Sequence, residues 1–214
     1  MNKSIIIVGA GPGLSAGVAE KFGNEGFTVG LISRNEKKLA QMQQDLRQKN
    51  ITAYYTTADA YRAEELGGAL RRLSRQVGRV DVLHYNAAAL KMKDLMEETS
   101  DALVEDFKIS TAHAFHSVKV LLEELKSAQG AILLTGGVFA TNPSPAFGSL
   151  SLGKAALRNL AYQLHGVLQP EGVYVGTMTI DGYIQSNSET HSPKVLAEKF
   201  WEMYRNRTDI ELRY

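Results

Sequence analysis

Three glycines in the segment VGAGPGLSAG are spaced for phosphate binding. Gly9, Gly11 and Gly13 follow a short apolar run and precede a segment with helical periodicity. Glycine allows the backbone to approach a ligand closely, and the free N–H groups and dipole of a helix N-terminus attract an anion. The pattern predicts a site for the pyrophosphate of a dinucleotide, with a tight strand–helix turn that holds no ligand as the alternative.

The end of the second apolar run indicates which dinucleotide is bound. A flavin-binding pattern would need glycine where Leu14 stands, and an NAD site favours a carboxylate after the second strand to bind a ribose hydroxyl. The sequence has Ser33 and Arg34 at that point. A guanidinium matches the geometry of a 2′-phosphate, so we predict NADP(H) ahead of NAD(H), and both ahead of FAD. A solvated loop charge is the alternative role for Arg34.

Lys154 is a third candidate, because it lies in the otherwise small and apolar segment GSLSLGKAAL. Residues 148–153 provide no carboxylate, and their small side chains suit the close approach of a ligand. We therefore predict that Lys154 binds a ligand. The alternatives are a lysine that extends along its helix to solvent and one that pairs with a distant carboxylate.

The elements that must position these residues alternate between short apolar strands and longer amphipathic helices. Because the strands are apolar on both faces, the pattern predicts a parallel sheet with helices on each side, and right-handed crossovers make it doubly wound. We expect a single α/β Rossmann-like domain over residues 1–214 with about seven strands. Strands are predicted at 4–8, 27–33, 52–57, 80–85, 131–136, 173–180 and 210–214, and helices at 14–26, 36–50, 61–78, 100–126, 148–168 and 192–206.

Composition excludes several classes of function. The chain has 24 basic and 23 acidic residues and a net charge of +1, which gives no electrostatic indication of nucleic-acid binding. It has no cysteine, so disulfides and thiolate metal sites are excluded. No run approaches the roughly 20 apolar residues that span a bilayer. We expect a soluble cytoplasmic protein without a membrane or nucleic-acid partner.

The order and spacing of these motifs resemble the short-chain dehydrogenase/reductase family over nearly the whole chain. The family's T-G-x-x-x-G-x-G falls on residues 8–15, its N-N-A-G on YNAA at 85–88, and its P-G on Asp181–Gly182. In this resemblance Asp59 lies beside the adenine, Lys154 binds the ribose hydroxyls, and the residues after Gly182 lie near the nicotinamide amide. The cofactor-binding residues that it implies are Gly9, Gly11, Gly13, Leu14, Ser33, Arg34, Asp59, Asn86, Ala87, Lys154, Gly182, Ile184 and Ser186.

The same resemblance implies an atypical catalytic set. Family members use a tyrosine four residues before the lysine to protonate a carbonyl oxygen, a serine that binds that oxygen, and an asparagine that helps to hold the lysine. Here the tyrosine position is Leu150 and the asparagine position is Ser110. The serine position is Gly137, or Gly136 if the alignment shifts by one. Of the four, Lys154 alone is present.

Other side chains could supply a proton. Tyr85 and Tyr183 follow predicted strands at the end of the sheet where such folds have their clefts, so we name both as candidate donors. Phe147, at the tyrosine position of some enoyl reductases, has no proton to give. His113 and His116 have a spacing that can bind a metal, but no further ligand stands at a suitable distance, and we predict no metal site.

Two functions remain open on this sequence. The first is an NADP(H)-dependent oxidoreductase that transfers hydride to or from a small carbonyl, enone or imine, with a non-standard or absent proton donor. The second is a catalytically inactive NADP(H)-binding sensor or assembly protein. The family resemblance also implies a homodimer or homotetramer formed through the two long helices, 100–126 and 148–168.

Overall fold

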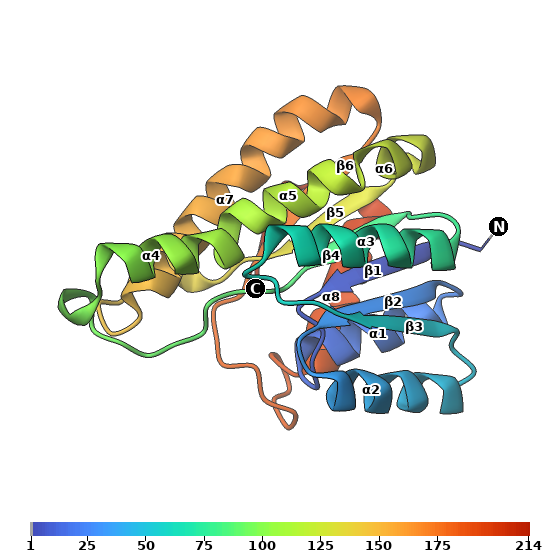
Figure 1. Cartoon of the computed structure of the whole chain (residues 1–214), viewed down its shortest axis with the longest axis horizontal. Coiled ribbons are helices and arrows are strands. Elements are labelled where there is room, and N and C mark those ends of the chain that lie inside the picture. The colour runs from blue at the N-terminus through green and yellow to red at the C-terminus, as the bar shows by residue number, and fades with distance from the viewer. Residues whose placement is uncertain (1) are drawn as a thin grey trace.

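A seven-stranded parallel sheet forms the centre of the molecule in this computed structural model, which describes residues 2–214 (Figure 1). Every neighbouring pair of strands is parallel. The predicted doubly wound α/β fold is therefore confirmed. In spatial order the strands are β3 (Ala53–Thr57), β2 (Thr28–Ser33), β1 (Ser4–Val8), β4 (Val82–Tyr85), β5 (Ala131–Thr135), β6 (Tyr174–Thr179) and β7 (Glu211–Arg213).

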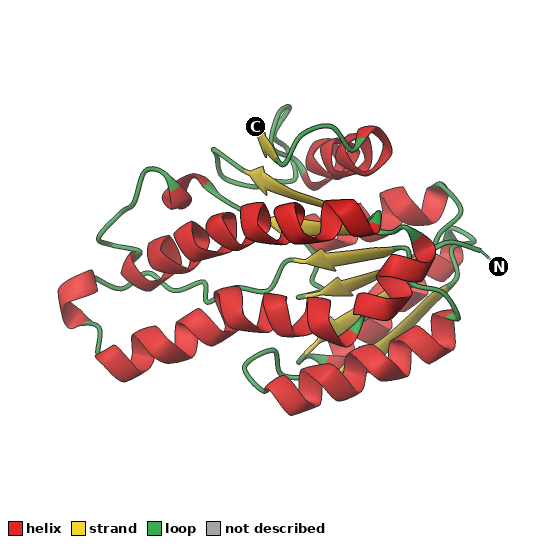
Figure 2. Ribbon diagram, turned by 90° about the horizontal axis from the view of Figure 1, so that it is seen from above, coloured by secondary structure: helices red, strands yellow, loops and turns green. Residues whose placement is uncertain are grey.

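Two layers of helices cover the sheet. One face packs against α1 (Leu14–Asn24), α2 (Glu36–Gln48) and α8 (Pro193–Asn206). The other packs against α3 (Ala63–Val77), α5 (His113–Val120), α6 (Leu122–Ala128) and α7 (Gly148–Leu168). The helix α4 (Ser100–Phe107) packs on α7 and extends beyond the strands (Figure 1). In Figure 2 the helices of this second layer run side by side across the strands.

Strand β1 shows why the inner strands are apolar on both faces. Successive side chains of a strand point to opposite faces. Ile5 and Ile7 belong to the core beneath α1, α2 and α8, whereas Ile6 and Val8 belong to the core beneath α3, α5 and α7. Both faces are covered, so all five residues of β1 are buried and no polar alternation is needed.

The long helix predicted over 100–126 is interrupted. A π-helical turn, Lys108–Ala112, separates α4 from α5, and α6 begins after a break at Leu121. The turn packs closely on α7, because a Cβ on Gly153 would lie 2.6 Å from the Cβ of Ser110. The hydroxyl of Thr111 donates a hydrogen bond to the Gly153 carbonyl at 3.1 Å. Single π turns within helices are frequent at functional sites.

The carboxyl ends of the parallel strands meet at one edge of the sheet. The loops after β1, β4, β5 and β6 therefore lie together there, which is where open α/β sheets bind ligands. Over residues 2–214, no helix has both the length and the apolar character needed to cross a bilayer.

Candidate functional site

A cavity of about 630 Å³ lies at the carboxyl ends of β1, β4, β5 and β6. Four loops distant in sequence form its wall, as expected for a parallel sheet. Half of the predicted site residues line this cavity, and the others are described below. Its lining consists of residues 11–15, 135–139 and 180–184, together with Asn86, Ala88, Leu90, Phe147, Leu150 and Lys154.

The three glycines after β1 have different roles. Gly9 has a φ of +84°, and a Cβ there would lie 2.6 Å from the Ala87 backbone nitrogen, so glycine is needed for the fold itself. Gly11 and Gly13 line the cavity, and no described atom lies within 4 Å of a Cβ placed on either. The space beside these two glycines is open to a ligand at the N-terminus of α1, where phosphate groups bind favourably.

The glycine loop is fastened to the loop after β4. The hydroxyl of Ser15 donates to the Gly9 carbonyl at 2.9 Å, and the Asn86 side-chain amide donates to the Ser15 hydroxyl at 2.8 Å. Ser15 was not among the predicted site residues. The signal for it was present, since the serine stands at the last glycine position of the motif.

A second cavity, of about 220 Å³, adjoins the first and shares Asn86, Ala88 and Leu90 with it. It is lined by residues at the ends of β1 and β2, including Gly9, Ser33 and Arg34. Its remaining lining residues are Val8, Ala10, Ile32, Ala58, Ala60, Ala87 and Ile109.

Arg34 is exposed, and its guanidinium lies 5.9 Å from the centre of the Tyr61 ring. It is therefore free to reach an anion at the end of β2. Asp59 does not line the small cavity, although its neighbours Ala58 and Ala60 do. Its carboxylate accepts a hydrogen bond from the Tyr61 backbone N–H at 3.0 Å. The structure thus places Asp59 beside this cavity rather than on its wall.

Lys154 is buried in α7 with its ammonium group at the large cavity. Nζ donates a hydrogen bond to the Thr135 carbonyl at 2.6 Å, and no ion pair involves it among the described residues. Burial lowers the pKa of this lysine to about 8. Both alternatives, a solvent-directed lysine and an ion-paired one, are therefore wrong.

The neighbours of Lys154 carry no acidic hydroxyl. Leu150, one turn earlier on the same face of α7, is buried and lines the cavity. A Cβ on Gly137 would lie 3.8 Å from the Lys154 Cε, whereas one on Gly136 would lie 2.7 Å from the Met178 carbonyl oxygen. Of the two candidate serine positions, Gly137 is thus the one with room for a side chain facing Lys154.

Ser110 lies in the π turn and does not line the cavity. It is buried, and its hydroxyl accepts a hydrogen bond from the Ala89 backbone N–H at 3.2 Å. Ser110 therefore holds the loop that carries Ala88 and Leu90 to the cavity wall.

The two candidate tyrosines have opposite environments. Tyr85 is completely buried, and its hydroxyl donates to the Ile109 carbonyl at 2.6 Å; burial raises its pKa. It does not line the cavity, because its side chain points into the core beneath α3, α5 and α7. This corrects the prediction that Tyr85 donates a proton to substrate. Tyr183 lines the cavity and is 82% exposed.

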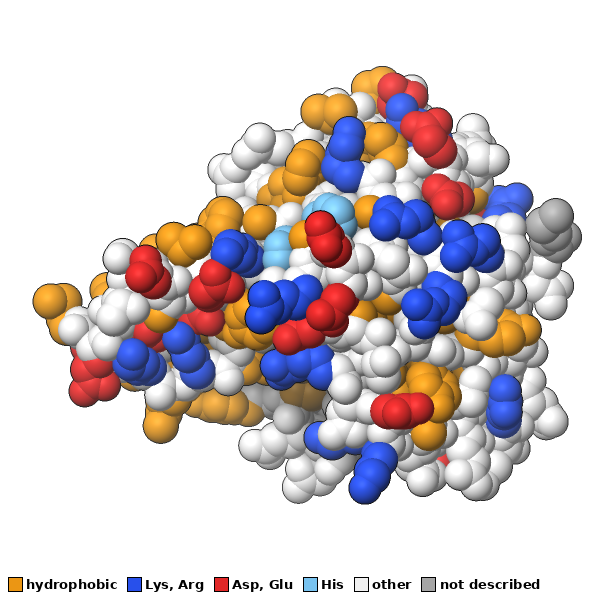
Figure 3. Space-filling view, viewed as in Figure 1, with side chains coloured by type: hydrophobic (Ala, Val, Ile, Leu, Met, Phe, Trp, Pro, Cys, Tyr) orange, Lys and Arg blue, Asp and Glu red, His pale blue; other side chains and the backbone are white. Residues whose placement is uncertain are grey.

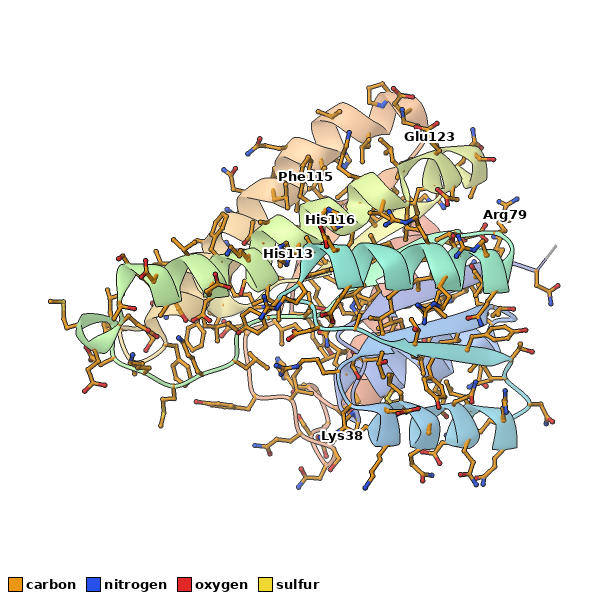
Figure 4. The ribbon with its side chains drawn as sticks, viewed as in Figure 1. Lys38, Arg79, His113, Phe115, His116 and Glu123 are labelled. Carbon is orange, nitrogen blue, oxygen red and sulfur yellow. The ribbon has the colours of Figure 1, made fainter. Side chains whose placement is uncertain are left out.

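The other predicted residues are divided between the cavity and its surroundings. Leu14, Gly182 and Ile184 line the large cavity, and Ser186 lines a neighbouring groove with Pro12 and Gly13. His113 and His116 lie at the start of α5 (Figure 4), where the His113 Nδ1 is 2.6 Å from the Ala60 carbonyl oxygen. Within residues 2–214 there is no group of three or more side chains suited to hold a metal ion.

Comparison with known proteins gives one family. A sequence profile described as short chain dehydrogenase matches residues 3–194. The human protein named short-chain dehydrogenase/reductase 3 is 28% identical over 145 residues, which are 67% of this chain and 48% of that protein. This chain thus spans about half the length of that relative. A diacetyl reductase of Staphylococcus epidermidis is 23% identical over 177 residues, 82% of this chain and 69% of the reductase.

Solved structures share the whole fold. An alcohol dehydrogenase from the archaeon Thermococcus sibiricus, solved as a complex with 5-hydroxy-NADP, superposes with a TM-score of 0.87 at 18% sequence identity. The match covers 99% of this chain and 96% of that one. At this level of identity the likeness concerns the fold alone.

Proposed function

The chain belongs to the short chain dehydrogenase family, whose members are oxidoreductases that use a nicotinamide cofactor, and from this premise we propose that it is an NADP(H)-dependent oxidoreductase with a non-standard proton donor. The observation that carries the proposal is the open cradle at Gly11 and Gly13, joined through one cavity wall to the buried ammonium of Lys154. A cradle at a helix N-terminus fits a pyrophosphate, and a buried ammonium fits ribose hydroxyls.

In this proposal the two cavities share the cofactor. The N-terminus of α1 holds the pyrophosphate, Ser33 and Arg34 bind the 2′-phosphate, and Lys154 binds the nicotinamide ribose. When bound, the cofactor supplies a hydride to a substrate carbon or takes one from it. The remaining predicted contacts, from Asn86 to Ser186, stay part of the proposal.

The proton is the unusual part of the chemistry. A buried leucine and a glycine face Lys154 at the tyrosine and serine positions, so no fixed hydroxyl there can protonate an oxygen. Loss of a general acid costs about 10²–10⁴-fold in rate. We therefore favour activated substrates, an enone or an imine, for which hydride transfer demands less acid at oxygen. Tyr183 is the proposed donor from this chain, because it lines the cavity with its hydroxyl accessible.

The second candidate function is a catalytically inactive NADP(H)-binding sensor or assembly protein. Leu150 and Gly137 favour it, because together they remove both groups that would bind a carbonyl oxygen. Turnover separates the two candidates: NADPH oxidation above background with any aldehyde, quinone, enone or imine supports the reductase. Tight NADPH binding with background oxidation across all four classes supports the sensor.

Fluorescence titration with NADPH and NADH tests the shared premise. We expect NADPH to bind more tightly than NADH, and Arg34→Ala to weaken NADPH binding about tenfold or more, since a hydrogen-bonded charge contributes about 1.5–3 kcal/mol. NADH binding stays within about twofold. Lys38→Ala, a neighbouring exposed cation shown in Figure 4, is the matched control and changes both affinities little. Equal affinities for NADPH and NADH in all three proteins contradict the NADP(H) preference.

We also propose that the chain forms a homodimer or homotetramer through its two long helical segments. Exposed apolar side chains lie on both, including Phe107 and Phe115 on the first and Leu152 and Val167 on α7. Figure 3 shows hydrophobic side chains along the side of the molecule that α7 forms. Light scattering of the wild type and Leu152→Asp tests this, and a monomeric wild type would contradict it.

A further inference from the structure

Two aromatic side chains in the lining of the large cavity stack on each other. Phe139 and Phe147 are stacked, with ring centroids 5.1 Å apart and planes inclined by 23°. Both are half-buried and both line the cavity, from opposite ends of the segment that joins β5 to α7. Each ring covers one face of the other, and the parts that line the cavity can contact a planar ligand. Aromatic contacts of this kind contribute beyond their buried area.

The rest of this end of the cavity is apolar as well. Leu150 and Ile180 also line the cavity. Lys154 and Asp181 are the only ionic side chains in the described lining, and in the proposed function Lys154 is engaged by the cofactor ribose. A substrate with an anionic group at this end would lose hydration beside the Asp181 carboxylate without finding a free cation in that lining, which costs free energy.

Two exposed apolar side chains on different loops line the large cavity. Leu90, after β4, is 79% exposed, and Tyr183, after β6, is 82% exposed, yet both line the cavity. A single exposed apolar residue is ordinary, but two on separate loops that line one cavity suit an apolar ligand that contacts both.

We propose that the substrate is a predominantly apolar molecule with a planar aromatic or conjugated group. The planar group packs against the pair formed by Phe139 and Phe147, and an apolar tail lies within the cavity against Leu90 and Tyr183. This inference rests on the proposed function for its chemistry, but its binding part depends only on the cavity.

Binding of matched ketones to the wild-type protein tests the inference without requiring turnover. Calorimetric titrations with 2-butanone, 2-hexanone, 2-octanone and 2-decanone are made with and without NADP⁺. We expect the affinity to rise about three- to fourfold for each added methylene until the cavity is filled. A probe with ten carbons and a terminal carboxylate, 9-oxodecanoate, binds at least tenfold more weakly than 2-decanone. A flat series, or equal binding of these last two ketones, overturns the proposal.

Phe139→Leu and Phe147→Leu test the role of the aromatic pair. We expect each to weaken binding of 4-phenyl-3-buten-2-one by about 2- to 10-fold, the loss of one aromatic contact, while 2-decanone changes less than twofold. Phe115→Leu, which removes an exposed ring on α5 outside the cavity (Figure 4), leaves both affinities unchanged. Unaltered binding of the phenyl ketone by both cavity variants overturns that role.

The proposed function and this inference fail in different ways. If NADPH does not bind but the ketone series shows its slope, the apolar site stands and the oxidoreductase proposal falls. If NADPH binds and the series is flat, the substrate class falls and the cofactor site stands. Circular dichroism together with the NADPH affinity verifies that each leucine variant is folded.

Discussion

The two ends of the large cavity are built from different kinds of contact. At the β1 and β4 end, polar groups are joined to one another, with Asn86 donating to Ser15 and Ser15 to the Gly9 carbonyl. At the β5 and β6 end, the wall is formed by Phe139, Phe147 and other apolar side chains. Strand β4 separates β1 from β5, so the two ends lie about 10 Å apart by ordinary strand spacing.

This difference shows which part of a binding site tolerates change. A phosphate-bearing ligand requires backbone N–H groups and glycines at fixed places, and that end of the cavity has them. The other end contacts the substrate. Here its lining is mostly apolar, and it lacks the tyrosine and serine hydroxyls that the family uses to bind a carbonyl oxygen. Lys154 stands at the boundary, bonded to Thr135 of β5 while facing the shared cavity.

Introducing hydroxyls at the apolar end would make the two ends of the cavity alike, and it has the largest expected effect on the rate of aldehyde reduction. In the double variant Gly137→Ser, Leu150→Tyr, the serine side chain has room beside Lys154, and the tyrosine would replace a side chain that already lines the cavity. We expect NADPH-dependent reduction of simple aldehydes to rise about 10²–10⁴-fold, the usual contribution of a general acid. Initial rates with benzaldehyde measure it.

The controls for this gain are the single variant Gly137→Ser and the triple variant that adds Lys154→Met. We expect the serine alone to give less than a tenfold gain, because a serine hydroxyl is a poor acid at neutral pH. The triple variant returns to the wild-type rate. A double variant that binds NADPH and remains folded, yet shows no gain, contradicts the assignment of positions 137 and 150.

At the polar end of the cavity, Gly9 is expected to be required for stability and Gly13 for ligand binding. Gly9→Ala places a Cβ 2.6 Å from a backbone nitrogen at a positive φ, so we expect a loss of about 4 kcal/mol in unfolding free energy from strain and overpacking combined. Gly13→Ala meets no described atom and leaves stability within about 0.5 kcal/mol. Urea denaturation measures both.

Cofactor affinity, in contrast to stability, is expected to change in Gly13→Ala. Gly13→Ala fills part of the open cradle, and we expect NADPH affinity to fall about tenfold in a protein of normal stability. Unchanged NADPH affinity in Gly13→Ala would show that this glycine does not face the phosphates. A Gly9→Ala protein as stable as wild type would contradict the close approach of the two loops.

The fold was largely predictable because its signals are periodic. The apolar runs at β1 and β5 lack polar alternation, which a sheet covered on both faces requires, and both are buried as expected. The glycine motif was interpretable for the same reason, since it lies between a strand and a helix. Lys154 was found because an isolated cation contrasts with small apolar neighbours, and the structure places its ammonium at the cavity.

The remaining features depend on contacts between distant segments. The π turn at Lys108–Ala112 packs against Gly153, which is 42 residues after Thr111, so the sequence of the helix alone predicted no interruption. Tyr85 was mistaken for a cavity residue because strand periodicity gives alternation but not which face is which. Phe139 and Phe147 meet through the path of a non-periodic loop, for which propensities give no register.

The boundary residue Lys154 makes a prediction about pH. Its pKa is lowered from 10.5 to about 8 in the folded protein because burial penalises the ammonium. Between these two values the unfolded chain holds the proton and the folded chain has released it, so stability rises with pH across this window. The shift corresponds to about 3 kcal/mol.

Lys154→Met isolates this contribution. We expect the unfolding free energy of wild type minus that of Lys154→Met to increase by about 3 kcal/mol from pH 8 to pH 10.5, and to be constant from pH 6 to pH 7. Denaturation at each pH measures it, and the subtraction removes groups that titrate alike in both proteins. A difference that is flat, or that falls as pH rises, would show that the lysine is hydrated in the folded state.

The smallest expected effect is the difference in unfolding free energy between a variant of the core tyrosine, Tyr85, and a variant of the cavity tyrosine, Tyr183. Tyr85→Phe removes the buried hydroxyl that donates to the Ile109 carbonyl, so we expect it to lower unfolding free energy by about 1 kcal/mol. Tyr183→Phe alters an 82% exposed side chain and leaves stability within about 0.5 kcal/mol.

For enzymatic activity the expectation is reversed: Tyr183→Phe changes kcat and Tyr85→Phe does not. With an aldehyde substrate, Tyr183→Phe lowers kcat while leaving NADPH affinity unchanged, because the hydroxyl is needed only when a proton is transferred. Tyr85→Phe retains the wild-type kcat, since its hydroxyl faces the core beneath α3, α5 and α7. Equal kcat values for wild type and Tyr183→Phe would mean that the proton comes from water, and the apolar end of the cavity would then contribute no acid from this chain.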